Sequence, residues 1–124
     1  MKCQPIPISS WEQYLAGPYT IIFAKTSCEK QQGLQGTKVL SDKTFVLFLN
    51  MHGGGYFHTK NCYFPIDIIA MDTSNKILNA WTAIPNLNSI GPMPPRTDKV
   101  LETKAGWMAS QKLKIGDVIP FIKS

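Results

Sequence analysis

Short apolar stretches, each bounded by turn-forming residues, recur along the whole chain. This pattern is typical of β-strands, because a strand needs only about five or six residues whereas an amphipathic helix needs about ten or more. Strands are therefore expected at residues 19–24, 44–49, 56–60, 64–71, 76–84, 100–103 and 118–122.

Three short helices are expected beside these strands. Residues 9–17 are predicted to be helical, because serines can cap the start and a Gly-Pro pair stops the helix. Thr26 and Glu29 have the spacing of a capping box, in which each side chain satisfies a free backbone donor of the other residue. Gly33 soon interrupts the helix that they open. A third short helix is expected over residues 105–111.

These elements predict a mainly β fold, a small sandwich or partly open barrel of six to seven short strands with two or three short helices. Nine Gly and nine Pro fit many strands joined by turns. At 124 residues we expect one domain, with residues 1–18 as an N-terminal extension carrying a short helix and residues 19–122 as the β domain. The Pro-rich segment 85–96 is predicted to be a long loop, either functional or a spacer.

Composition and charge narrow the function classes. An apolar fraction of 44% is enough for a core, so the chain is not predicted to be disordered. The net charge of +5 comes from twelve lysines spread over the whole length, and Arg96 is the single arginine. Nucleic-acid binding requires clustered basic residues, so nucleic acid is not an expected partner.

The three cysteines, Cys3, Cys28 and Cys62, are odd in number and lack paired spacing. We therefore expect no disulfide, and a buried or half-buried thiol at Cys62. The N-terminus has no apolar signal-peptide region, and no apolar run approaches the ~20 residues that span a bilayer. These features predict a soluble, cytoplasmic protein without a membrane association.

No complete catalytic or metal-binding constellation is present. His52, His58 and Cys62 could ligate zinc, but structural zinc takes four ligands and no fourth is apparent, so neither a metal nor a cofactor is expected. The segment after His52 is Gly-Gly-Gly, like the oxyanion loop of some esterases, but the Gly-x-Ser-x-Gly element that such enzymes need is absent. Enzymatic activity is left open.

Asp67 is the most informative single residue. In a strand, alternate side chains share a face, so Asp67 is expected to point the same way as Ile69 and Met71. Both faces of this stretch are apolar, which predicts that the Asp67 carboxyl is at least partly buried. A buried carboxylate requires a charged partner or several hydrogen bonds.

Four blocks of sequence carry a family resemblance. They are Gln32-Gly33-Leu34-Gln35-Gly36, Phe45-Val46-Leu47-Phe48, the run from Tyr56 to Ile69, and Val100 to Gly106 followed by Ile115-Gly116-Asp117. In order and spacing they resemble the family called domain of unknown function 192 (DUF192), over roughly residues 19–121. The pattern departs from the family at His58-Thr59, where the family has Trp-Met. The resemblance implies a mainly β sandwich or barrel, and it implies no particular activity.

The resemblance also places Lys60, Asn61 and Glu102 near Asp67. With His58, these residues would form a polar pocket that binds a ligand or carries acid–base chemistry. Alternatively, Asp67 is a structural acceptor for backbone donors, with Lys60 as its counter-ion.

Two classes of function follow. The first is a non-enzymatic binding or accessory module that engages a protein partner or a larger assembly. The alternative is a small enzyme or small-ligand binder that uses the pocket around Asp67, Lys60 and Glu102. The sequence predicts no oligomeric state.

Overall fold

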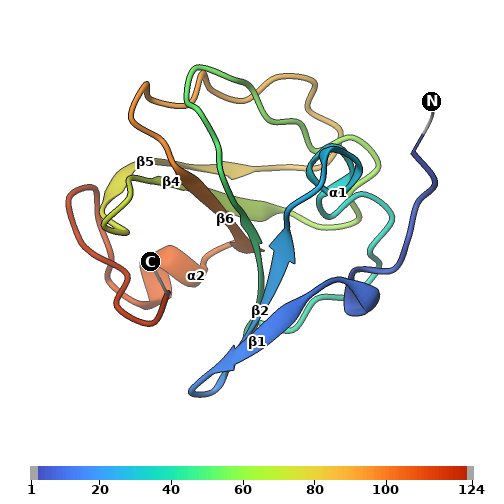
Figure 1. Cartoon of the computed structure of the whole chain (residues 1–124), viewed down its shortest axis with the longest axis horizontal. Helices are drawn as coiled ribbons and strands as arrows, with labels where there is room; N and C mark the ends of the chain where they lie inside the picture. Colours follow the sequence, from blue (N-terminus) through green and yellow to red (C-terminus); the bar gives the residue numbers. More distant parts are fainter. Residues whose placement is uncertain (1–2, 123–124) are drawn as a thin grey trace.

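The structure of the chain is a computed structural model that describes residues 3–122. Its centre is a six-stranded sheet in the order β1-β2-β3-β6-β4-β5 (Figure 1). The strands are β1 (Gln13–Ala16), β2 (Tyr19–Ala24), β3 (Thr44–Phe48), β4 (Ile66–Met71), β5 (Ile77–Ala83) and β6 (Lys99–Lys104). Strands β2 and β3 are parallel, and every other neighbouring pair is antiparallel.

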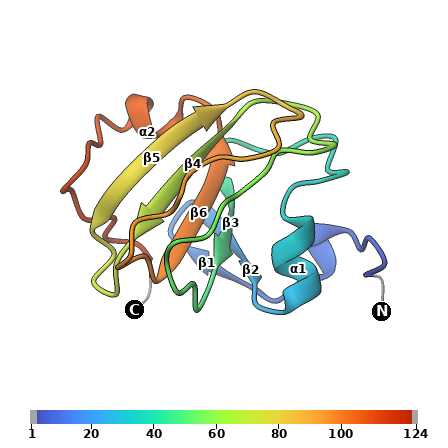
Figure 2. The same ribbon diagram turned by 90° about the horizontal axis from the view of Figure 1, so that it is seen from above.

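Helical segments are few and short. They are the 3₁₀ turn η1 (Ile8–Ser10), α1 (Ser27–Gln32) and α2 (Trp107–Ser110). Helix α1 lies in the crossover between the parallel strands β2 and β3, and α2 lies on the opposite side of the sheet (Figures 1 and 2). At six and four residues, both α-helices of the described chain fall far short of the length that crosses a membrane.

The predicted mainly β fold is confirmed, and the sheet is not closed into a barrel because β1 and β5 form its two edges. The capping box of α1 is also confirmed. The Glu29 N–H donates to Thr26 Oγ1 at 3.1 Å, and the Thr26 N–H donates to Glu29 Oε1 at 3.1 Å. These two bonds satisfy the free donors at the helix start, so the local sequence specifies where α1 begins.

Three predicted elements are wrong. Residues 13–16 form the edge strand β1 and not a helix, because Gly17 adopts a φ of +60° and turns the chain back so that β1 pairs with β2. Residues 56–60 and 118–122 are not strands. Each region contains one isolated β-bridge, between Phe57 and Ile90 and between Val118 and Lys76.

Each face of the sheet carries its own apolar cluster. We call them the α1 face and the α2 face, after the helix that lies on each. The α1 face includes Ile22, Leu34, Val46, Phe48, Phe57, Ile66, Ile68 and Val100. The α2 face includes Ile21, Phe45, Leu47, Ile69, Met71, Leu101 and Trp107. Because successive strand residues point to opposite faces, a shift of one position moves a side chain from one cluster to the other.

Two long loops cover the α1 face together. The Phe57 N–H donates to the Ile90 carbonyl at 2.9 Å, and the Ile90 N–H donates to the Phe57 carbonyl at 2.8 Å. Two further bonds join Met93 to Gly54 and Gly55, at 2.9 and 2.8 Å. Segment 85–96 is thus a loop, as predicted, and it pairs with the loop that follows β3.

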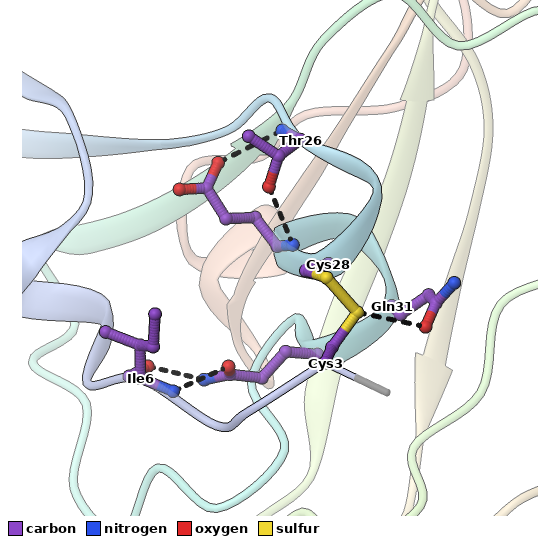
Figure 3. Close-up of a disulfide and its surroundings, with 7 residues drawn as sticks. Cys3, Ile6, Thr26, Cys28 and Gln31 are labelled. Atoms are coloured by element: carbon purple, nitrogen blue, oxygen red, sulfur yellow. Dashed lines mark hydrogen bonds between the residues drawn. A yellow bond between two sulfur atoms is a disulfide. The ribbon is translucent and has the colours of Figure 1, made fainter. Parts of the chain in front are cut away.

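The prediction that the chain has no disulfide is wrong. Cys3 and Cys28 are joined through their sulfur atoms (Figure 3). Cys62 is a buried free thiol, as expected. The bond ties the N-terminal segment to α1. Gln32 strengthens the attachment, since its side-chain amide accepts from the Ile6 N–H at 3.0 Å and donates to the Ile6 carbonyl at 2.7 Å. Spacing alone gives no sign of this pair, because the two cysteines are 25 positions apart and strands β1 and β2 lie between them.

Candidate functional site

Glu102 lies in the middle of β6, and its side chain points to the α1 face. It sits opposite Val46 of β3 and Ile68 of β4, both of which belong to the apolar cluster of that face. The residue is 2% exposed, and its Oε1 atom is buried without a hydrogen-bond partner among the described residues. A buried polar atom without a partner costs about 1–3 kcal/mol, so this carboxyl group needs an explanation.

Burial determines the protonation of Glu102. Loss of hydration raises the pKa of the carboxyl from 4.5 to about 8, because the apolar surroundings disfavour the charged form. The buried Cys62 thiol has its pKa raised to about 12 by its own burial and by the nearby Glu102. At neutral pH both groups are therefore mainly uncharged, and Cys62 is a poor nucleophile.

A pocket of about 230 Å³ opens above Glu102. It lies between the end of α1, the end of β3 and the loop around Phe57. Its lining residues are Lys30, Gln31, Gln32, Gly33, Leu34, Phe48, Met51, Tyr56, Phe57, His58 and Glu102. The walls are mainly apolar and aromatic, with Glu102 as the acidic group at the sheet. This is the composition of many small-molecule sites, in which a few polar groups are placed within an apolar surface.

Gly33 brings the end of α1 close to Glu102. Its φ is +51°, and a Cβ atom at this position would lie 3.2 Å from the Phe48 ring and 3.3 Å from Glu102 Oε1. Only glycine combines this backbone conformation with such a close approach at low cost. Gly33 thus shapes the pocket as well as ending the helix.

His58 connects this pocket with a larger hollow of about 630 Å³ on the side of the N-terminal segment. Gln31, Gln32 and His58 line both spaces. The Lys60 N–H donates to His58 Nδ1 at 3.1 Å. This bond makes Nδ1 the acceptor, so in the neutral ring Nε2 carries the proton and is the atom that can donate to a ligand.

Asp67 lies on the opposite face of the sheet from Glu102. It pairs with Thr103, one residue beyond Glu102, and so shares the α2 face with Ile69 and Met71 as expected. Its carboxylate accepts from the Thr82 hydroxyl at 2.7 Å and from the Met108 N–H at 3.1 Å. The geometry agrees with a structural acceptor that holds the start of α2 against the sheet.

We expect Asp67→Asn to lower the free energy of unfolding by about 1–3 kcal/mol, because the amide replaces one of two acceptor oxygens with a donor. Urea unfolding followed by circular dichroism measures this. Asp42→Asn is the matched control, since Asp42 is exposed, and it is expected to leave the midpoint unchanged. A variant at Asp67 as stable as the wild type would contradict the structural role.

The other residues predicted for the site do not lie together. His58 reaches the Glu102 pocket, whereas Lys60 lines the larger hollow and contributes to no ion pair with Asp67 in the described chain. Asn61 shapes the loop, since its φ is +56° and its N–H donates to Asn86 Oδ1 at 2.9 Å. The structure therefore keeps Glu102 and His58 together and places Asp67 elsewhere.

Sequence reasoning missed the apolar part of the site. The sequence predicts Phe48 and Phe57 as strand residues and singles out no role for Met51, because apolar pocket walls look like core residues in a sequence. Gly33 is predicted to end a helix and belongs to the first block of the family resemblance, but the sequence does not indicate that it lies beside Glu102. Across residues 3–122 no three His, Cys, Asp or Glu side chains converge as a metal-ligand group, so His52, His58 and Cys62 are not assembled into a set.

Together these features define a small, mainly β domain in which the buried acid Glu102 lines a mainly apolar pocket. The chain belongs to the DUF192 family, described as an uncharacterized ACR, which it matches over residues 12–121. No curated protein matches the sequence.

Two crystal structures share the fold. A protein of unknown function from Novosphingobium aromaticivorans DSM 12444 has a TM-score of 0.74 and 25% identity, over 95% of this chain and 91% of that chain. A "putative transcription regulator" from Sinorhizobium meliloti 1021 has a TM-score of 0.73 and 23% identity, over 81% of this chain and 79% of that chain. These two similarities concern the fold.

Proposed function

We propose that this chain is a non-enzymatic binding module that takes a small, partly apolar molecule into the Glu102 pocket. The observation that carries the proposal is the buried Oε1 atom of Glu102, which has no partner among the described residues and lies beside an open pocket. Such a group lowers the stability of the fold, and proteins keep stability-lowering polar groups chiefly at functional sites.

Binding fits the pocket better than catalysis does. The acid–base alternative requires at least two cooperating groups, and Asp67 is on the wrong face of the sheet to assist Glu102. His58 and Glu102 line the same pocket, but the Cys62 thiol near Glu102 is held protonated and supplies no nucleophile. A small enzyme that uses only Glu102 and His58 is the second candidate.

Filling the pocket should weaken ligand binding. We expect small alcohols, amides and aromatic fragments to shift the backbone amide signals of Gly33, Phe48 and Phe57 in ¹⁵N-resolved NMR spectra. Met51→Trp should weaken these effects by roughly tenfold or more, because the indole occupies the space of the ligand.

The matched control is Met108→Trp, since Met108 is also half-buried but packs on the α2 face. It should bind fragments as the wild type does. If no fragment shifts the pocket amides, or if Met51→Trp responds like the wild type, the small-ligand function is wrong.

A protein partner or larger assembly is a separate proposal. Its support is a set of large apolar side chains that stay more than half exposed: Leu15, Val39, Ile84, Ile115 and Val118. Light scattering after size exclusion tests it. We propose no role in transcription for this chain. Its twelve lysines are scattered and it has one arginine, whereas nucleic-acid binding requires clustered basic residues.

The cytoplasmic location expected from the sequence stays a prediction. The disulfide between Cys3 and Cys28 weighs against it, because structural disulfides persist mainly in oxidising compartments. We propose that an oxidising compartment suits this chain better.

A further inference from the structure

We propose that the Glu102 pocket takes a small organic ammonium ion with apolar substituents on its nitrogen, and that the ion binds against the ionised carboxylate. This inference rests on the proposed small-ligand function and names its ligand class.

The first argument is the missing counter-charge. The ion pairs of residues 3–122 join Lys25 to Glu12, Lys99 to Asp98 and Lys114 to Asp117, and none of them includes Glu102. Burial of an isolated carboxylate is costly, and a cation bound beside it removes most of that cost. A ligand that carries the positive charge would complete a pair that the protein leaves open.

The second argument is the chemistry of the walls. The rings of Phe48 and Phe57 stand nearly perpendicular, at 76°, with centroids 5.0 Å apart. Tyr56 and His58 add two further rings to the lining. Aromatic faces attract cations, and an ammonium with alkyl groups suits them best because its apolar surface needs little hydration. A primary ammonium, which is strongly hydrated, fits these walls less well.

The third argument is size. The pocket volume of about 230 Å³ exceeds the ~150 Å³ that accommodates benzene in an engineered cavity. It is therefore large enough for an ammonium with a few short alkyl groups.

The charged and titratable groups around the pocket decide how binding responds to pH. They are Glu102 on β6, Lys30 on α1, Tyr56 and His58 on the loop after β3, and the Cys62 thiol close to Glu102. Glu102 is mainly protonated at neutral pH. A bound cation favours its ionised form, so binding releases a proton and the affinity rises as the pH increases toward about 8. Lys30 opposes the cation, and Lys30→Gln is expected to tighten binding.

Choline and its uncharged carbon analogue 3,3-dimethylbutan-1-ol are the probes, because they have the same shape and differ only in charge. Neither titrates. We expect choline to bind roughly tenfold or more tightly at about pH 9 than at about pH 6, while the neutral analogue gains nothing. Titration calorimetry and amide shifts at Gly33 and Phe57 measure the affinities of both probes at each pH.

Variants distinguish the effect of Glu102 on choline binding from the effects of the other charged groups. Glu102→Gln should lose both the preference for choline and the pH dependence of choline binding. Glu12→Gln, which makes the same substitution at an exposed carboxylate, should retain both the preference and the pH dependence. Circular dichroism confirms that each variant is folded.

The outcomes distinguish the two proposals. If the neutral analogue binds as tightly as choline at about pH 9, or if Glu102→Gln still prefers choline, the ammonium inference is wrong and the small-ligand function stands. If neither probe nor any fragment shifts the pocket amides, both are wrong.

Discussion

Glu102→Gln is expected to make the protein more stable than the wild type at alkaline pH. In the wild type, the unfolded chain ionises Glu102 above about 4.5, whereas the folded chain keeps it protonated up to about 8. Between these values the unfolded state binds fewer protons than the folded state, so this group lowers stability as the pH rises. Above about pH 8 both states are ionised, so the stability lost through Glu102 no longer grows. Glutamine does not ionise and removes the loss.

The expected size is a few kcal/mol. The pKa of Glu102 rises from 4.5 in the unfolded chain to about 8 in the folded chain. At about 1.4 kcal/mol for each pH unit, this difference lowers the free energy of unfolding by at most about 5 kcal/mol. At about pH 5 the variant should be as stable as the wild type or slightly less so, because a buried amide also lacks a partner here. The informative quantity is therefore the difference between the two pH values, measured by urea unfolding at about pH 5 and about pH 9.

Glu12→Gln serves as the control, since Glu12 is exposed and paired only with Lys25 on the surface. Its effect should be small and should differ little between the two pH values. Parallel pH profiles for the wild type and the Glu102 variant would show that the buried carboxyl ionises normally. That result would remove the electrostatic basis of the site.

Local sequence signals predicted those elements that local interactions decide. Helix α1 begins directly after its N-cap residue Thr26, because its capping box is complete within four residues. Strands β2, β3 and β4 were found from apolar runs that are buried on both faces.

Elements that depend on distant pairing were predicted less well. Residues 13–16 read as a helix because serines precede them and glycine follows, but pairing with β2 outweighs this weak propensity. The segment around Phe57 has strand-like residues, yet its partner is the loop at Ile90 and not a strand of the sheet.

The candidate site shows the same limit. The family resemblance implies that Asp67 and Glu102 lie close together, and the strands that carry them, β4 and β6, are indeed adjacent. Whether their side chains share a face of the sheet depends on a single position of register. Asp67 is paired with Thr103 and Ile68 with Glu102, so the two acidic side chains point to opposite faces. One residue reverses the face, and no property of either strand taken alone fixes that offset. Glu102 and Asp67 thus have separate roles, one beside a pocket and one at a helix start.

Removal of the disulfide is the second change with a large expected effect. In the double variant Cys3→Ser, Cys28→Ser we expect the free energy of unfolding to fall by roughly 3 kcal/mol, since the link closes a loop between residues 25 apart and so restricts the unfolded chain. Urea unfolding with and without a thiol reductant measures it: the reductant should destabilise the wild type and leave the variant unchanged.

Thiol counting in denaturant checks the same bond independently. The oxidised wild type should present one reactive thiol, Cys62, and the reduced chain three. Three thiols in protein prepared under oxidising conditions would contradict the bond. Loss of the link should also speed amide exchange at Ile6, because the two hydrogen bonds with Gln32 then hold the N-terminal segment on α1 without covalent support. Cys3 and Cys28 line the hollow next to the Glu102 pocket, so ligand affinity in the same variant measures how far the attachment shapes the site.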